Sequence, residues 1–479
     1  MYRILSPSSP SFLILVGLIV LVATPAPVPA GDRLVVHEWG TFTSLQDEQG
    51  NALSGINVDD EPVPPFVHNL SPFLLGKPIL SHEHWIYRMK AVPRRHPQVT
   101  MRLETPVIYF YPPAQSESLR LNLEVQFLGG WLTEYYPSAE VDAPGLHERN
   151  FEFGDLSEQT VGCLRWSDLE IGAEGSGPST DWKVWTAPRE VAAATVRSVE
   201  GEYEKYLFYR GVGHLPAPLR VAVNRSTREL EIGGSPPPVG TRDTTATIAR
   251  SWLVDIRDDQ RCAFRTVPEF ELRVDNRALL ATTSYAFAEE EYAPQRLTAL
   301  RKEMHSELTR AGLFDDEATA MLNTWERAYF TSPGLRLFYV VPRSWTDAVL
   351  PLRLSIDADI ARVMLGRIEL ISDRQQELLE RLAETPPSND AWIRNIEPEE
   401  AKQRLLAGRI DFGDVGVVVP DDYRLYLGLG RFRNALLIHA EQVARHAWRE
   451  QPERGERYSQ FIDTYALHPF RAPSATLDH

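Results

Sequence analysis

The sequence predicts an α+β protein in which an N-terminal, antiparallel β-sandwich-like domain is followed by a helix-rich α+β domain. Many short segments before about residue 290 alternate between apolar and polar residues, which is typical of strands with one buried face. After Pro294 the apolar residues recur every three or four positions, which is the spacing of amphipathic helices. We therefore expect a β-rich domain over residues 31–290 and a helical α+β domain over residues 291–479.

Residues 1–30 have the features of a secretory signal peptide. Arg3 supplies the positive start, residues 12–23 form an apolar run, and Ala30 is the small residue expected before a cleavage site. The run is shorter than the roughly 20 residues of a membrane-spanning helix, and no later segment approaches that length. We expect an exported chain, periplasmic, cell-surface or secreted, without a transmembrane span after cleavage. Retention of the leader as an anchor is the alternative.

The β-rich part contains several segments with strand-like alternation, punctuated by Pro- and Gly-rich turns. Residues 119–128 are the clearest, because Leu121, Leu123 and Val125 share one face while Asn122 and Glu124 share the other. The other expected strands cover residues 99–111, 161–171, 206–210, 219–224, 229–232, 245–256 and 270–274. Many short strands with such turns favour an antiparallel sandwich.

The helical part begins with an expected helical hairpin. Leu300, Met304 and Leu308 lie on one helical face, Gly312 suits the end of that helix, and Asp315 is the expected N-cap of the next. Strands are expected over residues 335–341 and 362–371, the second with a bulge at Gly366. Further helices are expected after a capping box formed by Ser372 and Gln375, from Pro398 to Gly408, and over residues 432–449.

The formal net charge of −16 argues against nucleic acid as a partner, because an acidic protein repels phosphate groups. Cys163 and Cys262 are the only cysteines. In an exported chain a disulfide persists, so we expect these two residues to pair; two buried free thiols are the alternative.

Histidines are concentrated near the start of the mature chain. His82 and His84 are two residues apart, so on a strand both imidazoles would face the same side and could bind one metal ion. His37, Glu38, His68 or Glu104 would supply a third ligand. A divalent metal such as zinc or calcium is the expected cofactor of such a site. The alternative for His82 and His84 is a solvated loop.

A second grouping of carboxylates and imidazoles suits acid–base chemistry or a metal site. It comprises His37, Glu38, Asp60, Glu61, His68 and Glu104. We expect His37, Glu38 and Glu104 to be the catalytic groups, and Glu61 and His68 to join His82 and His84 as metal ligands. The alternative is structural: these side chains would bond to neighbouring backbone or cap strand ends. The functional reading requires that they converge in one pocket.

Aromatic residues in the β-rich part offer a different function. If they are exposed on the sheet, they would stack on sugar rings; if they are buried, they fill the core. The residues concerned are Trp131, Tyr135, Tyr136, Trp182 and Trp185.

Five strings give the chain a resemblance to a known family: HEWGTFTS (37–44), DDEPVPPFVH (59–68), RLETPVIYFY (102–111), YRGVGH (209–214) and WERAYFTSPGLRLFYVVPR (325–343). They resemble a family of exported bacterial proteins found in planctomycetes and related bacteria. The resemblance covers nearly the whole mature chain and implies export and a shared fold, but no activity.

Two hypotheses for the function follow. In the first, the exported β domain carries a His/carboxylate site, metal-dependent or acid–base. In the second, the protein is a non-catalytic module that binds a glycan or a cell-envelope protein.

Overall fold

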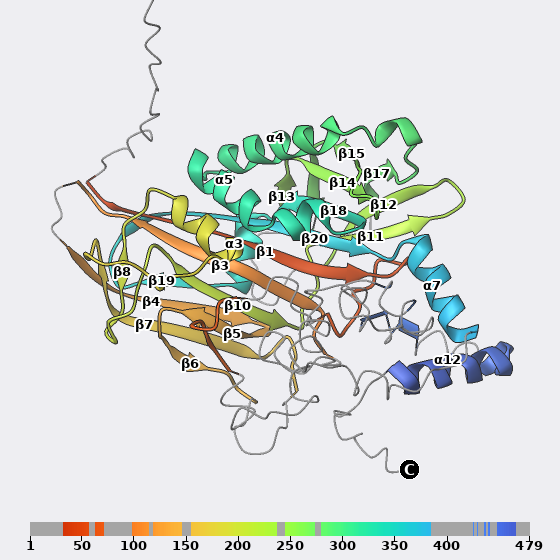
Figure 1. Ribbon diagram of the computed structural model, residues 1–479, viewed down its shortest axis with the longest axis horizontal. Helices are drawn as coiled ribbons and strands as arrows, with labels where there is room; N and C mark the ends of the chain where they lie inside the picture. The colour runs from red at the N-terminus through yellow and green to blue at the C-terminus, as the bar shows by residue number, and fades with distance from the viewer. Residues whose placement is uncertain are drawn as a thin grey trace, which may run out of the picture.

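The computed structural model describes residues 32–56, 63–70, 98–114, 118–145, 155–236, 245–273, 279–384 and 448–465, together with positions 425, 429, 435, 436, 439 and 440. The protein is a mixed α+β structure with one large mixed sheet, as the sequence predicts at that level (Figure 1).

The large sheet follows one path of hydrogen-bonded neighbours. The path is β15 (Cys262–Val267), β14 (Ser251–Ile256), β18 (Gly334–Val340), β20 (Ala358–Leu370), β1 (Leu34–Gln46), β3 (Met101–Tyr111), β10 (Leu207–Gly213), β5 (Gly130–Tyr136), β7 (Val161–Ile171), β4 (Leu119–Leu128) and β19 (Leu352–Leu354). Short strands join it at the side, namely β2 (His68–Asn69), β6 (Glu140–Asp142), β8 (Val196–Arg197) and β9 (Tyr203–Glu204). Two smaller sheets comprise β11 (Leu219–Asn224), β12 (Glu229–Gly234) and β17 (Leu279–Ser284), and β13 (Thr245–Ile248) with β16 (Phe270–Arg273).

The large sheet is strongly curled. Its last strand, β19, is seven strand pairings away from β20 along the path, which would be about 34 Å in a flat sheet. Only residues 355–357 separate these two strands in the chain, and such a link spans at most about 14 Å. The end of the path must therefore bend back toward β20.

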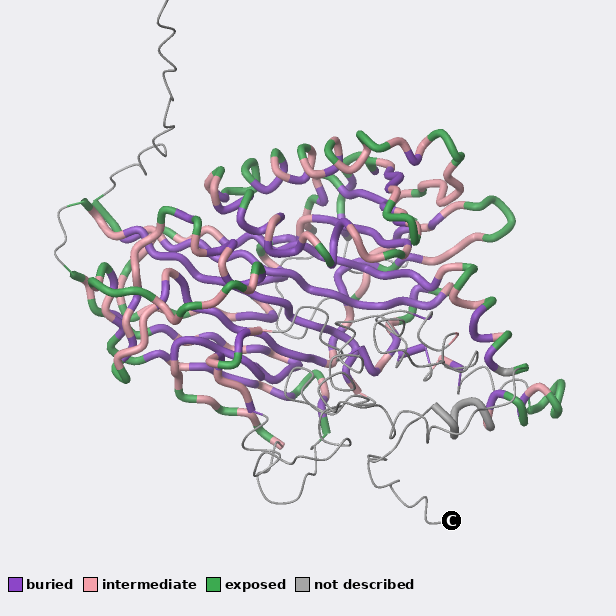
Figure 2. The backbone as a smooth tube through the Cα atoms, viewed as in Figure 1, coloured by how far each residue is buried: buried purple, intermediate pink, exposed green. Residues whose placement is uncertain are grey.

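The curl gives the sheet an inner and an outer face, each with its own apolar cluster. The inner cluster contains Leu123 of β4, Leu337 of β18 and Trp345 of α6 (Arg343–Val349). The outer cluster contains Trp39 of β1 and Met304 of α4 (Gln295–Arg310), and Figure 1 shows helices covering this face. Figure 2 shows the central strands buried along most of their length, while exposed residues lie on the outer helices and turns.

The helices that cover the outer face are those the periodicity predicts. They are α4 (Gln295–Arg310) and α5 (Asp315–Thr324), followed by a π-helix, η3 (Glu326–Thr331). Leu300, Met304 and Leu308 of α4 are buried at helical spacing, as expected. The N-cap of α5 is Phe314 rather than Asp315. The Glu317 carboxylate accepts a hydrogen bond from the Phe314 backbone N–H at 2.7 Å.

The other helices whose bounds lie within the described residues are α3 (Lys183–Thr186), η1 (Ala187–Glu190), η2 (Glu289–Glu291), α7 (Asp373–Glu384) and α12 (Pro452–Tyr465). The capping box that opens α7 is confirmed: the Ser372 backbone N–H donates to Gln375 Oε1 at 3.0 Å, and the Gln375 N–H donates to Ser372 Oγ at 3.3 Å. Within the described ranges, no helix has both the length and the apolar character needed to cross a bilayer.

One expectation is wrong, and two others stay unconfirmed. The bulge expected at Gly366 is wrong, because β1 and β20 pair without a break from Leu34–Ala358 to Gln46–Leu370. Gly366 has a packing role instead: a Cβ there would lie 2.1 Å from Tyr339 Cζ. The sandwich and the division near residue 290 are not confirmed, because β20 and β18 lie in the same sheet as β1.

Candidate functional site

His37, on the outer face of β1, is bound to a carboxylate that the sequence analysis did not identify. His37 Nδ1 donates to Glu317 Oε2 at 2.7 Å, and the Tyr111 hydroxyl donates to Glu317 Oε1 at 2.7 Å. Phe314 packs on the His37 ring with 4.3 Å between ring centroids. Burial, reinforced by the negative charge of Glu317, raises the pKa of Tyr111. The imidazole of β1 is therefore linked through Glu317 to the first turn of α5 and to Tyr111 of β3.

Glu38 points to the opposite face of the sheet from His37, because consecutive residues on a strand alternate. Its carboxylate accepts hydrogen bonds from Arg362 Nε on β20 and from the Tyr209 hydroxyl on β10. Arg362 Nη1 also donates to Asp347 Oδ1 at 2.8 Å. Although burial opposes its charge, the Glu38 carboxylate raises the pKa of Arg362, and burial raises that of Tyr209. Glu38 is thus a fully buried carboxylate neutralised by an arginine.

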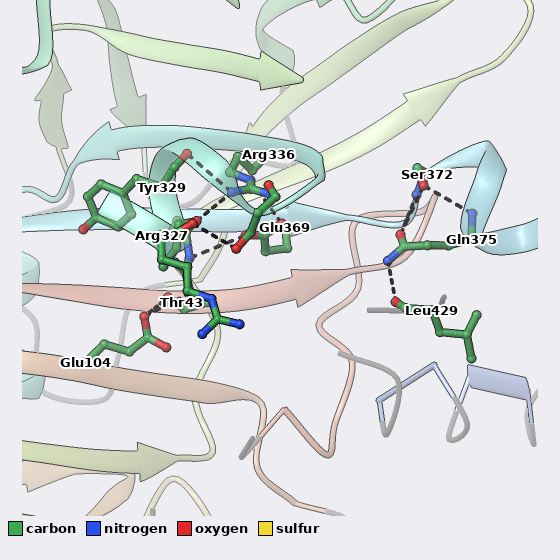
Figure 3. Close-up of polar contacts among 12 residues, drawn as sticks. Thr43, Glu104, Arg327, Tyr329, Arg336, Glu369, Ser372, Gln375 and Leu429 are labelled. Atoms are coloured by element: carbon green, nitrogen blue, oxygen red, sulfur yellow. Dashed lines mark hydrogen bonds and ion pairs between the residues drawn. The ribbon is translucent and has the colours of Figure 1, made fainter. Parts of the chain in front are cut away.

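Glu104 lies on the outer face of β3, and it too is paired with an arginine from β20. Arg367 Nη2 donates to Glu104 Oε2 at 3.0 Å, and the Thr43 hydroxyl donates to the same oxygen at 3.1 Å. Arg102 Nη2 forms an ion pair with Glu104 Oε1. Figure 3 shows Glu104 and Thr43 on neighbouring strands, on the side that also carries Arg336 and Glu369. Glu104 has no exposed surface.

These contacts share one property, which sequence reasoning did not foresee. Each of the three residues expected to be catalytic binds a residue from beyond position 290. We call the contacts His37–Glu317, Glu38–Arg362 and Glu104–Arg367 the polar seam. The polar seam joins the N-terminal strands β1 and β3 to β20 and α5, on both faces of the sheet.

The seam continues into a row of buried charges across the outer face. Four arginines there are at most 1% exposed, and buried glutamates lie among them. The row contains Glu134 (β5), Arg210 (β10), Arg102 and Glu104 (β3), Arg367 and Glu369 (β20), and Arg336 (β18), on strands that are neighbours in the sheet apart from the intervening β1. Arg336 Nε lies 3.4 Å from Glu369 Oε2, and Arg210 Nη1 lies 3.7 Å from Glu134 Oε2. Charges are tolerated in the interior only when they are paired in this way.

Irregular backbone accompanies this row. The pairing register shifts between β1 and β3, between β3 and β10, and between β10 and β5, so three successive pairings are interrupted. Thr105, beside Glu104, has a φ of 41°, which is rare for a β-branched residue. The Thr105 hydroxyl accepts a hydrogen bond from Arg210 Nε at 3.0 Å. Bulges redirect side chains, and here polar groups come to lie on a face that is otherwise apolar.

The π-helix η3 closes one end of the row. Arg336 Nη1 donates to the Ala328 carbonyl at 2.7 Å, and Nη2 donates to the Ser332 carbonyl at 2.7 Å. Tyr329 of η3 shares a hydrogen bond with the Thr41 hydroxyl of β1. A buried arginine thus satisfies carbonyl groups that the irregular helix leaves open.

The expected single pocket is not formed. Glu104 pairs with Thr41, four residues along β1 from His37, which is about 13 Å on a strand. His68 lies on β2, which pairs with β5 and is therefore four strand pairings from β1. Its Nε2 lies 2.9 Å from Glu202 Oε1, and its ring stacks on that of Tyr135. The predicted convergence is therefore wrong, because the sheet places each group beside a different partner.

The remaining metal-ligand candidates, Glu61, His82 and His84, lie outside the described residues. Among the residues that the structure describes, no group of three or more His, Cys, Asp or Glu side chains is arranged to hold a metal ion.

The predicted disulfide is wrong. Cys163 lies on β7 and Cys262 on β15, eight strand pairings apart along the large sheet, and both are buried free thiols. The alternative of two buried thiols is the one observed. Burial raises the pKa of each thiol to about 11.

The aromatic residues considered for glycan stacking are mostly in the core. Trp131, Tyr135, Tyr136 and Trp185 are all buried, and only Trp182 is partly exposed. Trp185 packs against Tyr206 and Phe208 in the outer cluster, with ring centroids 5.5 Å and 4.8 Å away.

No protein-family model and no curated protein matches this sequence. Among solved structures, the chain is similar to the Fcho1 Mu homology domain of Danio rerio with bound Eps15 peptide. The similarity covers 71% of this chain and 95% of that chain, at 9% identity and a TM-score of 0.26. A score this low does not demonstrate a common fold, so the similarity carries no argument about function.

Proposed function

We propose that this chain is an exported, non-catalytic module that binds a protein of the cell envelope. One observation carries the proposal. Every described residue expected to be catalytic is buried and bound internally, to Glu317, Arg362 or Arg367. Glu38 and Glu104 have no exposed surface, so neither carboxylate can meet a substrate.

A protein partner is favoured over a glycan, because the tryptophans and tyrosines that would stack on sugars are mostly buried. Export rests on the sequence features of residues 1–30. We expect the mature chain to start at Gly31, which intact-mass measurement of the protein from its native host would establish. A mass that includes residues 1–30 would mean that the leader is retained as an anchor and that the chain is not released by cleavage.

The binding proposal is tested on whole cells with a membrane-impermeant amine cross-linker. We expect the exported chain to give a discrete cross-linked species whose second component mass spectrometry identifies. A chain that begins at residue 31 and stays inside the cell is the matched control. If the exported chain gives no cross-linked species, or the same one as the control, the proposed envelope partner is wrong.

The absence of catalysis is tested separately, with chromogenic esters, glycosides and phosphate esters. We expect no turnover above that of heat-denatured protein. Turnover that disappears in His37→Gln or Glu104→Gln, while the circular dichroism spectrum is unchanged, would show that the seam residues are catalytic.

A second candidate function rests on His68. Unlike His37, this residue is half-buried: its side chain is 35% exposed, and that of Glu202 is 28% exposed. An accessible imidazole oriented by a carboxylate is suited to acid–base chemistry or to metal binding. Thermal unfolding with added zinc or calcium tests it in the wild type, His68→Gln and His82→Ala/His84→Ala. Stabilisation lost in these variants would favour this candidate over the binding module.

A further inference from the structure

The pairing of β1 with β20 raises a problem of register. The two strands run parallel over thirteen residue pairs, and twelve of the thirteen residues of β1 are buried. A shift by one residue would move each side chain to the other face, but a shift by two residues keeps the faces unchanged. Because both faces of β1 are buried, burial alone does not oppose the two-residue shift.

The apolar residues around Glu38 and Arg362 do not by themselves exclude a two-residue shift. On the inner face of β1, Leu34, Val36 and Phe42 belong to the inner apolar cluster. On the inner face of β20, Met364, Ile368 and Leu370 are buried in the same cluster, and Ile360 packs against it. In one shifted register Leu34 would lie opposite Ile360 and Phe42 opposite Ile368. In the other, Val36 would lie opposite Ala358 and Phe42 opposite Met364.

The Glu38–Arg362 pair distinguishes the native register from the shifted ones. Glu38 lies directly opposite Arg362 in the ladder. A two-residue shift would put Ile360 or Met364 opposite Glu38, and would leave a fully buried carboxylate without its guanidinium. Such an unpaired buried charge is strongly unfavourable. The Glu104–Arg367 contact supports the same register from the outer face.

We propose that the Glu38–Arg362 pair is a register lock, which selects one alignment of the N-terminal strands on β20 and contributes little net stability. A buried ion pair loses much of its Coulomb energy to desolvation, and a well-packed apolar substitute is often equally stable. A single buried polar residue that fixes the alignment of apolar surfaces is known from coiled coils, where it acts at a cost in stability. Here the lock couples segments 324 residues apart in the chain.

The test uses pairs of cysteine substitutions placed just before or at the start of the paired strands. Arg33 and Asp357 extend the native ladder by one position, and Arg33 and Asp359 would be opposite each other after a two-residue shift. The native-register pair is therefore Arg33→Cys/Asp357→Cys, and the shifted-register pair is Arg33→Cys/Asp359→Cys. All three side chains are more than half exposed, so substituting them leaves the packed strands intact.

Each pair of substitutions reports one register, because a disulfide needs Cα atoms within about 7 Å. Cys163 and Cys262 are buried and do not compete. Both pairs are introduced separately into the wild type and into two lock variants, and each protein is refolded from denaturant and then oxidised. Glu38→Leu/Arg362→Met/Tyr209→Phe removes the lock together with the Tyr209 hydroxyl, which donates a hydrogen bond to Glu38. Arg362→Met/Met364→Arg moves the guanidinium two residues along the same face.

The three proteins should differ in which disulfide they form. With the native lock we expect oxidation to link the native-register pair only. With the lock removed, both the native-register and the shifted-register disulfides should form. With the lock moved, the shifted-register disulfide should predominate.

Three results would overturn the proposal. The first is formation of only the native-register disulfide in both lock variants. The second is that, with the native lock in place, the shifted-register disulfide forms in the same yield as the native-register disulfide. The third is failure of the lock-free variant to regain its far-ultraviolet circular dichroism, which would make the pair a source of stability instead.

Discussion

At the scale of single residues, the main finding is that side chains with catalytic character are used to join distant parts of the chain. An imidazole and a carboxylate at consecutive positions suggest chemistry, but on a strand they face opposite sides and cannot act together. His37 contacts Glu317 on α5, while Glu38 contacts Arg362 on β20. The sequence singles out these polar residues, but it contains no signal for their partners.

The first prediction concerns Arg362. Arg362→Met leaves Glu38 buried without a counter-charge, so the free energy of unfolding should fall by about 3–5 kcal/mol. The triple variant that also carries Glu38→Leu and Tyr209→Phe should lose much less. Urea denaturation followed by circular dichroism measures both, with the exposed Arg353→Met as control, which should change stability by less than about 0.5 kcal/mol. Equal losses in the single and triple variants would contradict this prediction.

The second prediction concerns the thiols. Burial raises the pKa of Cys163 and of Cys262 to about 11, so the reactive thiolate is scarce at neutral pH. In the native protein at pH 7.5, a thiol reagent should modify both residues slowly. After unfolding in guanidinium without reductant, two thiols per chain should react at once. If no thiol reacts under those conditions, Cys163 and Cys262 form the disulfide that the structure excludes.

The third prediction concerns acid. A hydrogen bond from Arg225 lowers the pKa of Glu48 from its usual value of 4.5, against the opposing effect of burial. A carboxyl whose pKa is lowered by folding stabilises the protein above its unfolded pKa, and this stability is lost as the pH falls through the folded value. As the pH is lowered below about 4.5, the urea midpoint of the wild type should therefore decrease more steeply than that of Glu48→Gln. The exposed Glu174→Gln is the control, and identical pH profiles for Glu48→Gln and the wild type would argue against the effect.

At the scale of elements, regular local patterns were predicted well. The strands β4, β7 and β11 have the predicted bounds, and α4 and the start of α7 were recognised from apolar spacing and a capping box. Irregular elements were missed. Neither the π-helix η3 nor the register shifts around Thr105 has a local sequence signal, because each depends on contacts with other strands.

The fourth prediction belongs to this scale. The alternation of residues 362–371 changes phase at Gly366, which predicts a bulge, but the glycine instead leaves room for the Tyr339 ring. Gly366→Ala should lower the free energy of unfolding by about 1–3 kcal/mol through overpacking. Tyr339→Leu should recover part of the loss in the double variant, as a double-mutant cycle would show. Additive losses would mean that the two residues do not interact.

At the scale of the whole molecule, the polar seam makes the two halves of the chain interdependent. β1 lies between β3 and β20, so a protein that ended near residue 290 would lack one neighbour of its central strand. It would also leave Glu38 and Glu104 without the arginines Arg362 and Arg367.

The fifth prediction follows from this arrangement. Residues 32–290 expressed alone should lack cooperative unfolding and be digested rapidly by protease, whereas co-expression with residues 291–479 should restore resistance. The full mature chain is the control. A fragment 32–290 that unfolds cooperatively at the same urea concentration as the control would establish the two-domain division that the sequence predicts.

The sequence by itself determined the mixed α+β class, most regular strands, the helical hairpin and which polar residues stand out. Each of these depends on residues close together in the chain, whose spacing follows from the geometry of a helix or a strand. The tertiary structure alone decided that β20 pairs with β1, that the two cysteines are free thiols on different strands, and that the expected catalytic residues are bound to arginines and to a distant carboxylate. Those outcomes depend on how the sheet curls and on which strands become neighbours, and desolvation then requires each buried charge to be paired.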